Sequence, residues 1–252
     1  MQTRKSKRFP DTINAVIPIV SGKGGVGKST ITALLACAMK ARASNIAILD
    51  IDIHGPNTPH MFDIQDQVFE TKDERIIPLT SQEGIQIASV GALGYGSDIA
   101  FVWRGPMKIG LIRQLLNDVL WEDDSILLVD TPPGTGDEIM TLSEEFQRVA
   151  GCIVVTTPQE IACLDAGRSI AYAKKVELPV IGVIENFSDT DDIHLFGSGA
   201  GRALASRYSV PYLGEICVDP RLMQKSPRMV QMEQNILSTS LVDSVYHACN
   251  QI

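Results

Sequence analysis

The sequence predicts an α/β fold with a doubly wound, mainly parallel sheet flanked by helices. Two observations lead to this fold class. Short runs rich in Val, Ile and Leu alternate with longer segments whose apolar residues recur at helical spacing, and acidic residues end two of the runs. Strands of a parallel sheet are covered on both faces and are therefore apolar throughout, and strand–helix alternation implies right-handed crossovers.

Strands are predicted where a run is short, apolar and bounded by polar residues or glycine. These runs are 14–20, 46–50, 85–90, 126–130, 152–157 and 180–185. Within the first run, Pro18 has no N–H to donate to a neighbouring strand, so we expect a bulge in the pairing there.

Helices are predicted where apolar residues fall on one face of a 3.6-residue period. These segments are 28–42, 107–120, 138–148, 160–176, 198–208 and 235–250. In the second of them, Met107, Leu111, Leu115 and Val119 follow one another at four-residue intervals. A helix with such an apolar face is expected to pack on the sheet.

The chain is predicted to form a single P-loop domain over 13–252, because no internal repeat, low-complexity run or linker interrupts it. Its 252 residues, 44% of them hydrophobic, can form one sizeable core. Residues 1–12 are predicted to be a flexible basic arm, since termini are usually loose and this one carries four cationic side chains. These are Arg4, Lys5, Lys7 and Arg8.

Composition also limits the classes of partner. The net charge of −8 argues against a nucleic-acid partner, whose phosphates favour a basic surface. No apolar run reaches the roughly 18–20 residues that span a bilayer, so no stable membrane insertion is expected. The five cysteines are odd in number, widely spaced and without a Cys-x-x-Cys pair, which favours a reducing, cytoplasmic location.

The first predicted strand runs into a glycine-rich loop at 21–30, which reads Ser-Gly-Lys-Gly-Gly-Val-Gly-Lys-Ser-Thr and precedes a helix. This order of strand, loop and helix is the context that the phosphate-binding P-loop motif requires. The glycines let backbone amides surround a phosphate, and the helix start adds partial positive charge. The predicted nucleotide-binding residues are Gly22, Lys23, Gly24, Gly25, Val26, Gly27, Lys28, Ser29 and Thr30.

Two lysines of this loop have different predicted roles. Lys28 is predicted to pair with the β- and γ-phosphates of ATP, while the Ser29 hydroxyl ligates Mg²⁺. Lys23 is one lysine more than the motif requires, and it lies at the front of the loop. Two interpretations stay open: Lys23 reaches a nucleotide held by a second subunit, or it is an ordinary exposed lysine.

Carboxylates stand at the ends of two predicted strands. Asp50 and Asp52 close the second run, and Asp130 ends the run 126–130. Ligands of open α/β sheets bind at the carboxyl ends of the strands. We therefore predict that Asp50 and Asp130, together with Ser29, hold Mg²⁺, partly through water. The segment 131–137, a proline pair followed by glycines, is predicted to be a switch loop that senses the γ-phosphate.

The additional lysine makes the sequence resemble the MinD/ParA-type P-loop ATPases of the SIMIBI class. Further stretches resemble, within that class, the Mrp/ApbC subfamily of iron–sulfur cluster carriers, over roughly residues 14–222. These stretches are Asp50 to Asn57, Trp103 to Met107, Asp130 to Glu138, Thr156 to Glu160 and Glu185 to Ser188.

The resemblance implies a homodimer that binds and hydrolyses ATP at its interface. Lys23 would contact the partner's nucleotide, and Lys23, Lys28 and Asp52 would be the catalytic residues, with Asp52 placing the attacking water. The stretch from Trp103 would begin a helix at the dimer or client surface, and the clients would be apo metalloproteins or cluster-assembly proteins. The residues near the adenine ring would be Asn186, Asp219 and Pro220.

One stretch departs from the subfamily, whose carriers follow a Glu-Asn-Met-Ser segment with a Cys-x-x-Cys pair. Two subunits then hold a [4Fe-4S] cluster through four thiolates. Here the segment is Glu185 to Ser188, with Phe187 in place of Met, and residues 189–194 contain no cysteine. The nearest later thiol is Cys217. The sequence therefore identifies no Fe–S ligands and leaves the cluster open.

Residues 189–194 themselves allow two interpretations. Asp191, Asp192 and His194 are ligands that suit zinc or another divalent cation, and the alternative is a polar surface loop.

The favoured function is that of an ATP-hydrolysing homodimer in iron–sulfur or other metallocluster assembly or transfer. The alternative is a MinD/ParA-like positioning ATPase that binds a membrane, DNA or a protein partner. Membrane-binding versions need a basic amphipathic helix, and residues 232–252 contain no Lys or Arg. A metabolic kinase or ligase is a third possibility, with its acceptor site in the segment 53–104.

Overall fold

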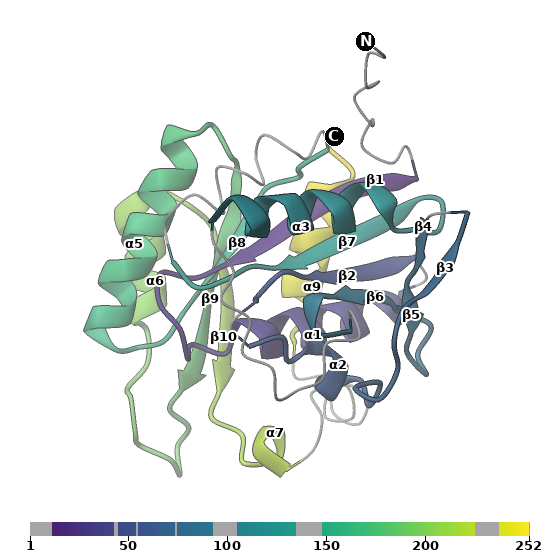
Figure 1. The fold of residues 1–252 in the computed structure, drawn as a ribbon. Coiled ribbons are helices and arrows are strands. Elements are labelled where there is room, and N and C mark those ends of the chain that lie inside the picture. The colour runs from purple at the N-terminus through teal and green to yellow at the C-terminus, as the bar shows by residue number, and fades with distance from the viewer. Residues whose placement is uncertain are drawn as a thin grey trace.

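A computed structural model describes residues 12–42, 45–53, 55–73, 75–92, 105–134, 148–224 and 237–251. Their centre is an eight-stranded sheet with the strand order β10-β9-β8-β1-β7-β2-β6-β5 (Figure 1). The strands are β1 (Ile13–Val20), β2 (Ile46–Asp50), β5 (Leu79–Thr80), β6 (Gln86–Ser89), β7 (Ser125–Asp130), β8 (Cys152–Thr156), β9 (Val180–Ser188) and β10 (Tyr212–Cys217).

The sheet is parallel except at one edge, where β5 pairs antiparallel with β6. The central strands are mostly apolar and are buried except at Asn14 of β1, as the sequence predicts for strands covered on both faces. Parallel pairing places the carboxyl ends of β1, β2, β7, β8 and β9 along one edge of the sheet. The doubly wound, mainly parallel fold class is confirmed.

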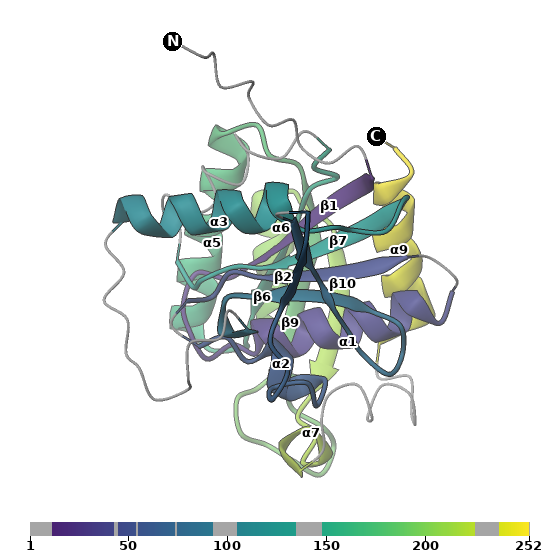
Figure 2. The ribbon, with the colours of Figure 1, turned by 45° about the vertical axis from the view of Figure 1, so that its right-hand side comes forward.

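Helices cover both faces of the sheet (Figures 1 and 2). Helices α1 (Lys28–Lys40) and α9 (Thr239–Cys249) contact each other on one face. The other face carries α3 (Gly105–Asp118), α5 (Glu160–Lys175) and α6 (Ala200–Tyr208). The remaining helices are short: α2 (Thr58–Met61), α7 (Arg221–Gln224) and the 3-10 turn Val90–Ala92.

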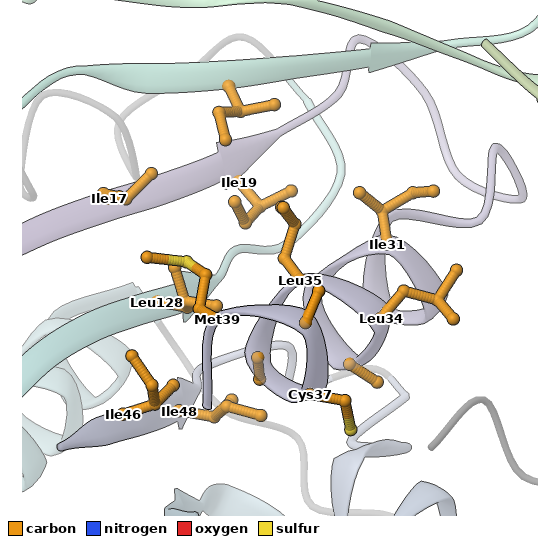
Figure 3. Packing of buried hydrophobic residues seen from close by; sticks show 14 of the residues in the cluster. Ile17, Ile19, Ile31, Leu34, Leu35, Cys37, Met39, Ile46, Ile48 and Leu128 are labelled. Atoms are coloured by element: carbon orange, nitrogen blue, oxygen red, sulfur yellow. The ribbon is translucent and has the colours of Figure 1, made fainter. Parts of the chain in front are cut away.

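Alternation along the strands divides the core between the two faces. Ile17 and Ile19 of β1 belong to the cluster under α1, whereas Val16 faces α3 and Val20 faces α5. Figure 3 shows the first of these layers, with Leu35 of α1 directed toward β1. No helix among the described residues is long and apolar enough to cross a bilayer.

Several elements differ from the sequence prediction. Strand β10 was not predicted, because its mixed polar pattern and its glycine at Gly214 hide it. The hairpin of β3 (Glu70–Lys72) and β4 (Arg75–Ile77) is short and exposed, and it was also missed. Strand β9 continues to Ser188, beyond the predicted end at 185. Some predicted features lie outside the described residues: the basic arm up to residue 11, Trp103 and Arg104, the segment 135–147 and the beginning of the helix predicted at 235–250.

Pro18 lies in the centre of the sheet, and its neighbours show how the sheet accepts it. Its pairing with β7 is regular. On the β8 side the partners change from Val16↔Val149 to Ile19↔Ile153, so β8 has one residue more than β1 across this interval. The pairing is therefore irregular opposite Pro18, as a strand residue without an N–H requires.

Candidate nucleotide-binding site

The glycine-rich loop joins the end of β1 to the start of α1, at the carboxyl edge of the sheet. Gly25 and Gly27 have φ angles of 80° and 85°, a left-handed conformation that favours glycine. Gly27 is the residue before α1, so the amides of the first helical turn face the loop. A pocket of about 200 Å³ lies there, lined by Ser21, Lys23 to Thr30, Asp52, Asn57, Met61 and Pro133.

Two glycines of the loop are required by close neighbours. A methyl group on Gly27 would lie 2.2 Å from Nδ2 of Asn186, and one on Gly22 would lie 2.1 Å from the carbonyl carbon of Asp165 in α5. Asn186 also donates from Nδ2 to the carbonyl oxygen of Val26 at 2.9 Å. The end of β9 and the helix α5 therefore hold the two ends of the loop.

The predicted phosphate lysine is paired with a predicted metal ligand. Nζ of Lys28 lies 2.5 Å from Oδ1 of Asp130, and both side chains are buried. Burial raises the pKa of Asp130, and the charge of Lys28 opposes that increase. The Ser29 hydroxyl lies close enough to lower the same pKa. The structure thus brings Lys28, Ser29 and Asp130 together.

Asp50 ends β2 directly opposite Asp130 on β7. Its carboxylate accepts hydrogen bonds from the backbone N–H of Asp52 at 3.1 Å, from that of Thr58 at 3.3 Å and from the Ser89 hydroxyl at 3.1 Å. Burial and then the nearby charge of Asp130 raise the pKa of Asp50 to about 7. A cation near both carboxylates would favour their ionised forms.

These residues fit a magnesium ion. Oδ2 of Asp130 is buried and has no hydrogen-bond partner among the described residues, so it can accept from a water ligand of the metal. Carboxylate and hydroxyl oxygens are hard ligands of the kind Mg²⁺ takes, usually with several waters retained. Ser29, Asp50 and Asp130 are the residues that would hold it.

The pocket wall opposite the loop comes from the segment after β2. Asp52 is half-buried and lines the pocket, together with Asn57 and with Met61 of α2. Asn57 and Met61 were not predicted as site residues. Asn57 stands only five residues after Asp52, so its place in the same stretch was the available signal.

Lys23 lines the pocket and is half-buried. Its Nζ lies 3.4 Å from Oε1 of Gln159, the residue that precedes α5. The first turns of α5 carry two exposed apolar side chains, Ile161 at 67% and Leu164 at 50% exposure. Lys23 therefore borders a partly apolar surface beside the pocket.

The residues predicted near the adenine ring lie at the ends of β9 and β10. Asn186 is buried, and neither it nor the other two lines the pocket. The N–H of Val218 donates to the carbonyl oxygen of Ser188 at 2.8 Å, which places Asp219 and Pro220 beside the end of β9. The carboxylate of Asp219 accepts hydrogen bonds from Arg221, and these lower its pKa.

The loop between β9 and α6 is ordered by its own hydrogen bonds. Oδ1 of Asp189 accepts from the N–H groups of Leu195 and Phe196 at 2.9 and 2.8 Å, and these bonds lower the pKa of Asp189. Cys217 lies near this loop, and its pKa is raised by burial and by the charges of Glu215 and Asp191. The described residues contain no group of three or more His, Cys, Asp or Glu side chains that could hold a metal ion.

Comparison with known proteins matches this fold and site to one family. The family described as ParA, NUBPL iron-transfer P-loop NTPase, matches residues 12–252. An iron–sulfur cluster carrier protein of Methanocaldococcus jannaschii is 39% identical, over 92% of this chain and 82% of its own length. The cytosolic Fe-S cluster assembly factor CFD1 of Candida glabrata is also 39% identical, over 93% of this chain and 86% of its own length.

A solved structure has a similar fold. A nucleotide-binding protein from Archaeoglobus fulgidus in complex with ADP superposes with a TM-score of 0.74 and 32% identity, covering 89% of this chain and 90% of that one. The two chains thus share their overall fold. The chain belongs to the ParA family of NUBPL-type iron-transfer P-loop NTPases.

Proposed function

We propose that this protein is an ATP-hydrolysing homodimer that acts in the assembly or transfer of iron–sulfur clusters in the cytoplasm. The observation that carries the ATPase part is the buried group of Lys28, Asp50 and Asp130 beside the phosphate loop. The cluster part is supported by the relatives, which are named as cluster carriers and cytosolic assembly factors.

In this proposal each side chain has a separate task in the attack of water on the γ-phosphate. Lys28 exchanges its contact with Asp130 for phosphate oxygens, and the loop amides bind the same phosphates. Asp52, half-buried at the pocket wall, orients the attacking water. Ser29, Asp50 and Asp130 would hold Mg²⁺, which would supply positive charge beside the phosphates.

The proposal of a homodimer is based on the surface around Lys23. The ammonium group of Lys23 lies beside Gln159, the residue before α5, and the first turns of α5 carry the exposed side chains of Ile161 and Leu164. A second copy placed on this surface would cover the apolar side chains and would bring its own nucleotide close to Lys23. ATP would then hold the two copies together through contacts that exist only in the closed state.

The number of exposed thiols in this chain limits how it could bind an iron–sulfur cluster. A [4Fe-4S] cluster takes four thiolates, whereas Cys217 is the one exposed cysteine of the five. Two chains therefore offer two exposed thiols. We propose that client proteins, apo metalloproteins or cluster-assembly proteins, supply the remaining ligands. The raised pKa of Cys217 favours its protonated form, so iron should be held weakly by this chain alone.

The cargo proposal is tested by anaerobic reconstitution with iron and sulfide, followed by measurement of iron per chain. We expect less than one full cluster per dimer, loss of that iron in Cys217→Ser, and its retention in the control Cys163→Ser. Cys163 is a half-buried thiol on α5. Equal iron in the wild type and in Cys217→Ser would contradict the role of Cys217, and no iron at all would sink the carrier role.

A further inference from the structure

Phe187 holds an unusual backbone conformation at the end of β9. Its φ angle is 61°, in the left-handed region that bulky residues rarely occupy. Such a conformation persists only where the surrounding structure fixes it, and it concentrates at ligand clamps and switch regions. The half-buried ring of Phe187 is therefore held in a defined place between its neighbours.

One neighbour of the ring is the phosphate loop. A methyl group on Gly27 would lie 3.6 Å from Cζ of Phe187, so the edge of the ring faces the last loop residue before α1. The preceding residue, Asn186, binds the carbonyl oxygen of Val26. Two successive residues of β9 thus lie against the loop at Val26 and Gly27, so a shift of the loop backbone would disturb both.

The other neighbour is Phe196 in the loop between β9 and α6. The two ring centroids are 6.3 Å apart, within the range of favourable aromatic pairs. Phe196 and Leu195 form the apolar tip of this loop, with exposures of 41% and 65%. The loop extends beyond the carboxyl ends of the strands (Figure 1).

Hydrogen bonds within the loop that carries this tip allow the loop to move as a unit. Asp189 binds the N–H groups of both tip residues, and Thr190 and Ile193 bind each other. At its far end, the N–H of Gly199 donates to the buried carboxylate of Glu185 at 2.7 Å. Both ends of the loop are therefore attached to the last residues of β9.

We propose that Phe187 is a positioning residue that couples the phosphate loop to the Leu195–Phe196 tip. Binding of nucleotide at 22–29 changes the exposure of the tip, and a partner bound at the tip changes nucleotide affinity by the same factor. An apolar tip exposed in one nucleotide state gives a client a contact that is lost in the other. The proposal rests on the proposed function in requiring that the loop bind nucleotide.

Hydrogen exchange with and without Mg-ADP tests the first direction of this coupling. In the wild type we expect ADP to change the protection of residues 189–199. The change should disappear in Phe187→Asn, because Asn accepts the left-handed conformation but removes the ring. It should persist in the control Leu195→Ala. An unchanged response in Phe187→Asn would overturn the proposal.

The reverse direction is tested by ADP affinity, without relying on the Phe187 variant to fold. Phe196→Ala alters an exposed residue and should change the dissociation constant by roughly 2- to 10-fold, the range of an aromatic pair. Leu195→Ala should leave it unchanged. Equal effects of Phe196→Ala and Leu195→Ala would refute the coupling.

The two proposals fail in different ways. If the wild-type chain bound no Mg-ADP, the proposed function would fall and the coupling with it. If the chain bound ADP with ordinary affinity while residues 189–199 kept the same protection, the coupling alone would be overturned.

Discussion

Asp50 shows how one side chain can be placed for function at a cost in stability. It is fully buried, its three hydrogen-bond donors are fixed by the backbone and by Ser89, and a second buried carboxylate faces it. Burial of a charge without a cation is unfavourable, which is why the pKa of Asp50 rises to about 7.

The variant Asp50→Asn should therefore stabilise the metal-free protein while abolishing ATP hydrolysis. The raised pKa of Asp50 limits the gain in the free energy of unfolding to about 4 kcal/mol at neutral pH. Because the substitution also removes an acceptor oxygen, we expect a gain of about 1–2 kcal/mol. Urea unfolding at pH 7.5 without Mg²⁺ measures this gain. Asp52→Asn, which removes a charge from a half-buried position, is the control and should gain less.

The pH dependence of that gain has a defined sign. The folded pKa of Asp50 lies above its ordinary value, so the folded state binds the proton more tightly than the unfolded state does. The free-energy cost of ionising the buried Asp50 carboxyl is absent below about pH 4, grows as the pH rises toward 7 and is constant above 7. The difference between the wild type and Asp50→Asn should follow this course, and a difference independent of pH would exclude Asp50 as its source.

At the scale of elements, the phosphate loop is held by two parts of the fold that lie far away in the sequence. Helix α5 rests directly on Gly22, and the end of β9 rests on Gly27. The glycines at the two ends of the loop thus serve packing as well as phosphate binding, since their missing Cβ atoms leave room for these neighbours.

Gly22→Ala should separate α5 from the loop. The new methyl group would meet a backbone carbon of Asp165 at 2.1 Å, and backbone cannot rotate away. We expect a loss of about 2–3 kcal/mol in the free energy of unfolding without nucleotide. The matched control is Gly24→Ala in the same loop, whose nearest neighbour would be Pro133 at 3.7 Å and whose stability should change by less than about 0.5 kcal/mol. Similar losses in both variants would contradict this packing role of Gly22.

At the scale of the whole molecule, Lys23 lines the pocket and its ammonium group reaches Gln159, the residue before α5. Gly24 and Gly25, which also line the pocket, are exposed, and so are Ile161 and Leu164 of α5. In the proposed homodimer a second copy would complete this site when both copies bind ATP, which would make hydrolysis depend on assembly.

Lys23→Ala should then abolish hydrolysis and leave nucleotide binding nearly intact. We expect a loss of turnover on the order of 100-fold or more, as for other cationic side chains supplied across an interface. Lys175→Ala, which removes an exposed lysine from the far end of α5, is the control and should retain full turnover. Unchanged turnover in Lys23→Ala would refute the cross-subunit role, which sedimentation with ATP would test independently.

Most strands, the phosphate loop and the three carboxylates could be predicted from the sequence, because they depend on local patterns. Apolar runs define the central strands, and the Gly-Lys-Ser end of the loop follows from the backbone geometry that a phosphate requires. The edge strand β10 and the hairpin β3–β4 could not be predicted, since their residues are partly exposed and have no clear periodicity.

By itself the sequence determined the phosphate loop and the strand ends that carry Asp50 and Asp130, since both follow from residue order. Only the tertiary structure decided which distant groups meet the loop, because the strand order brings β9 and α5 to it across more than a hundred residues. The contacts of Asn186 with Val26 and of Asp165 with Gly22 are of this kind. No local pattern encodes such pairs, because each depends on how the whole sheet is wound.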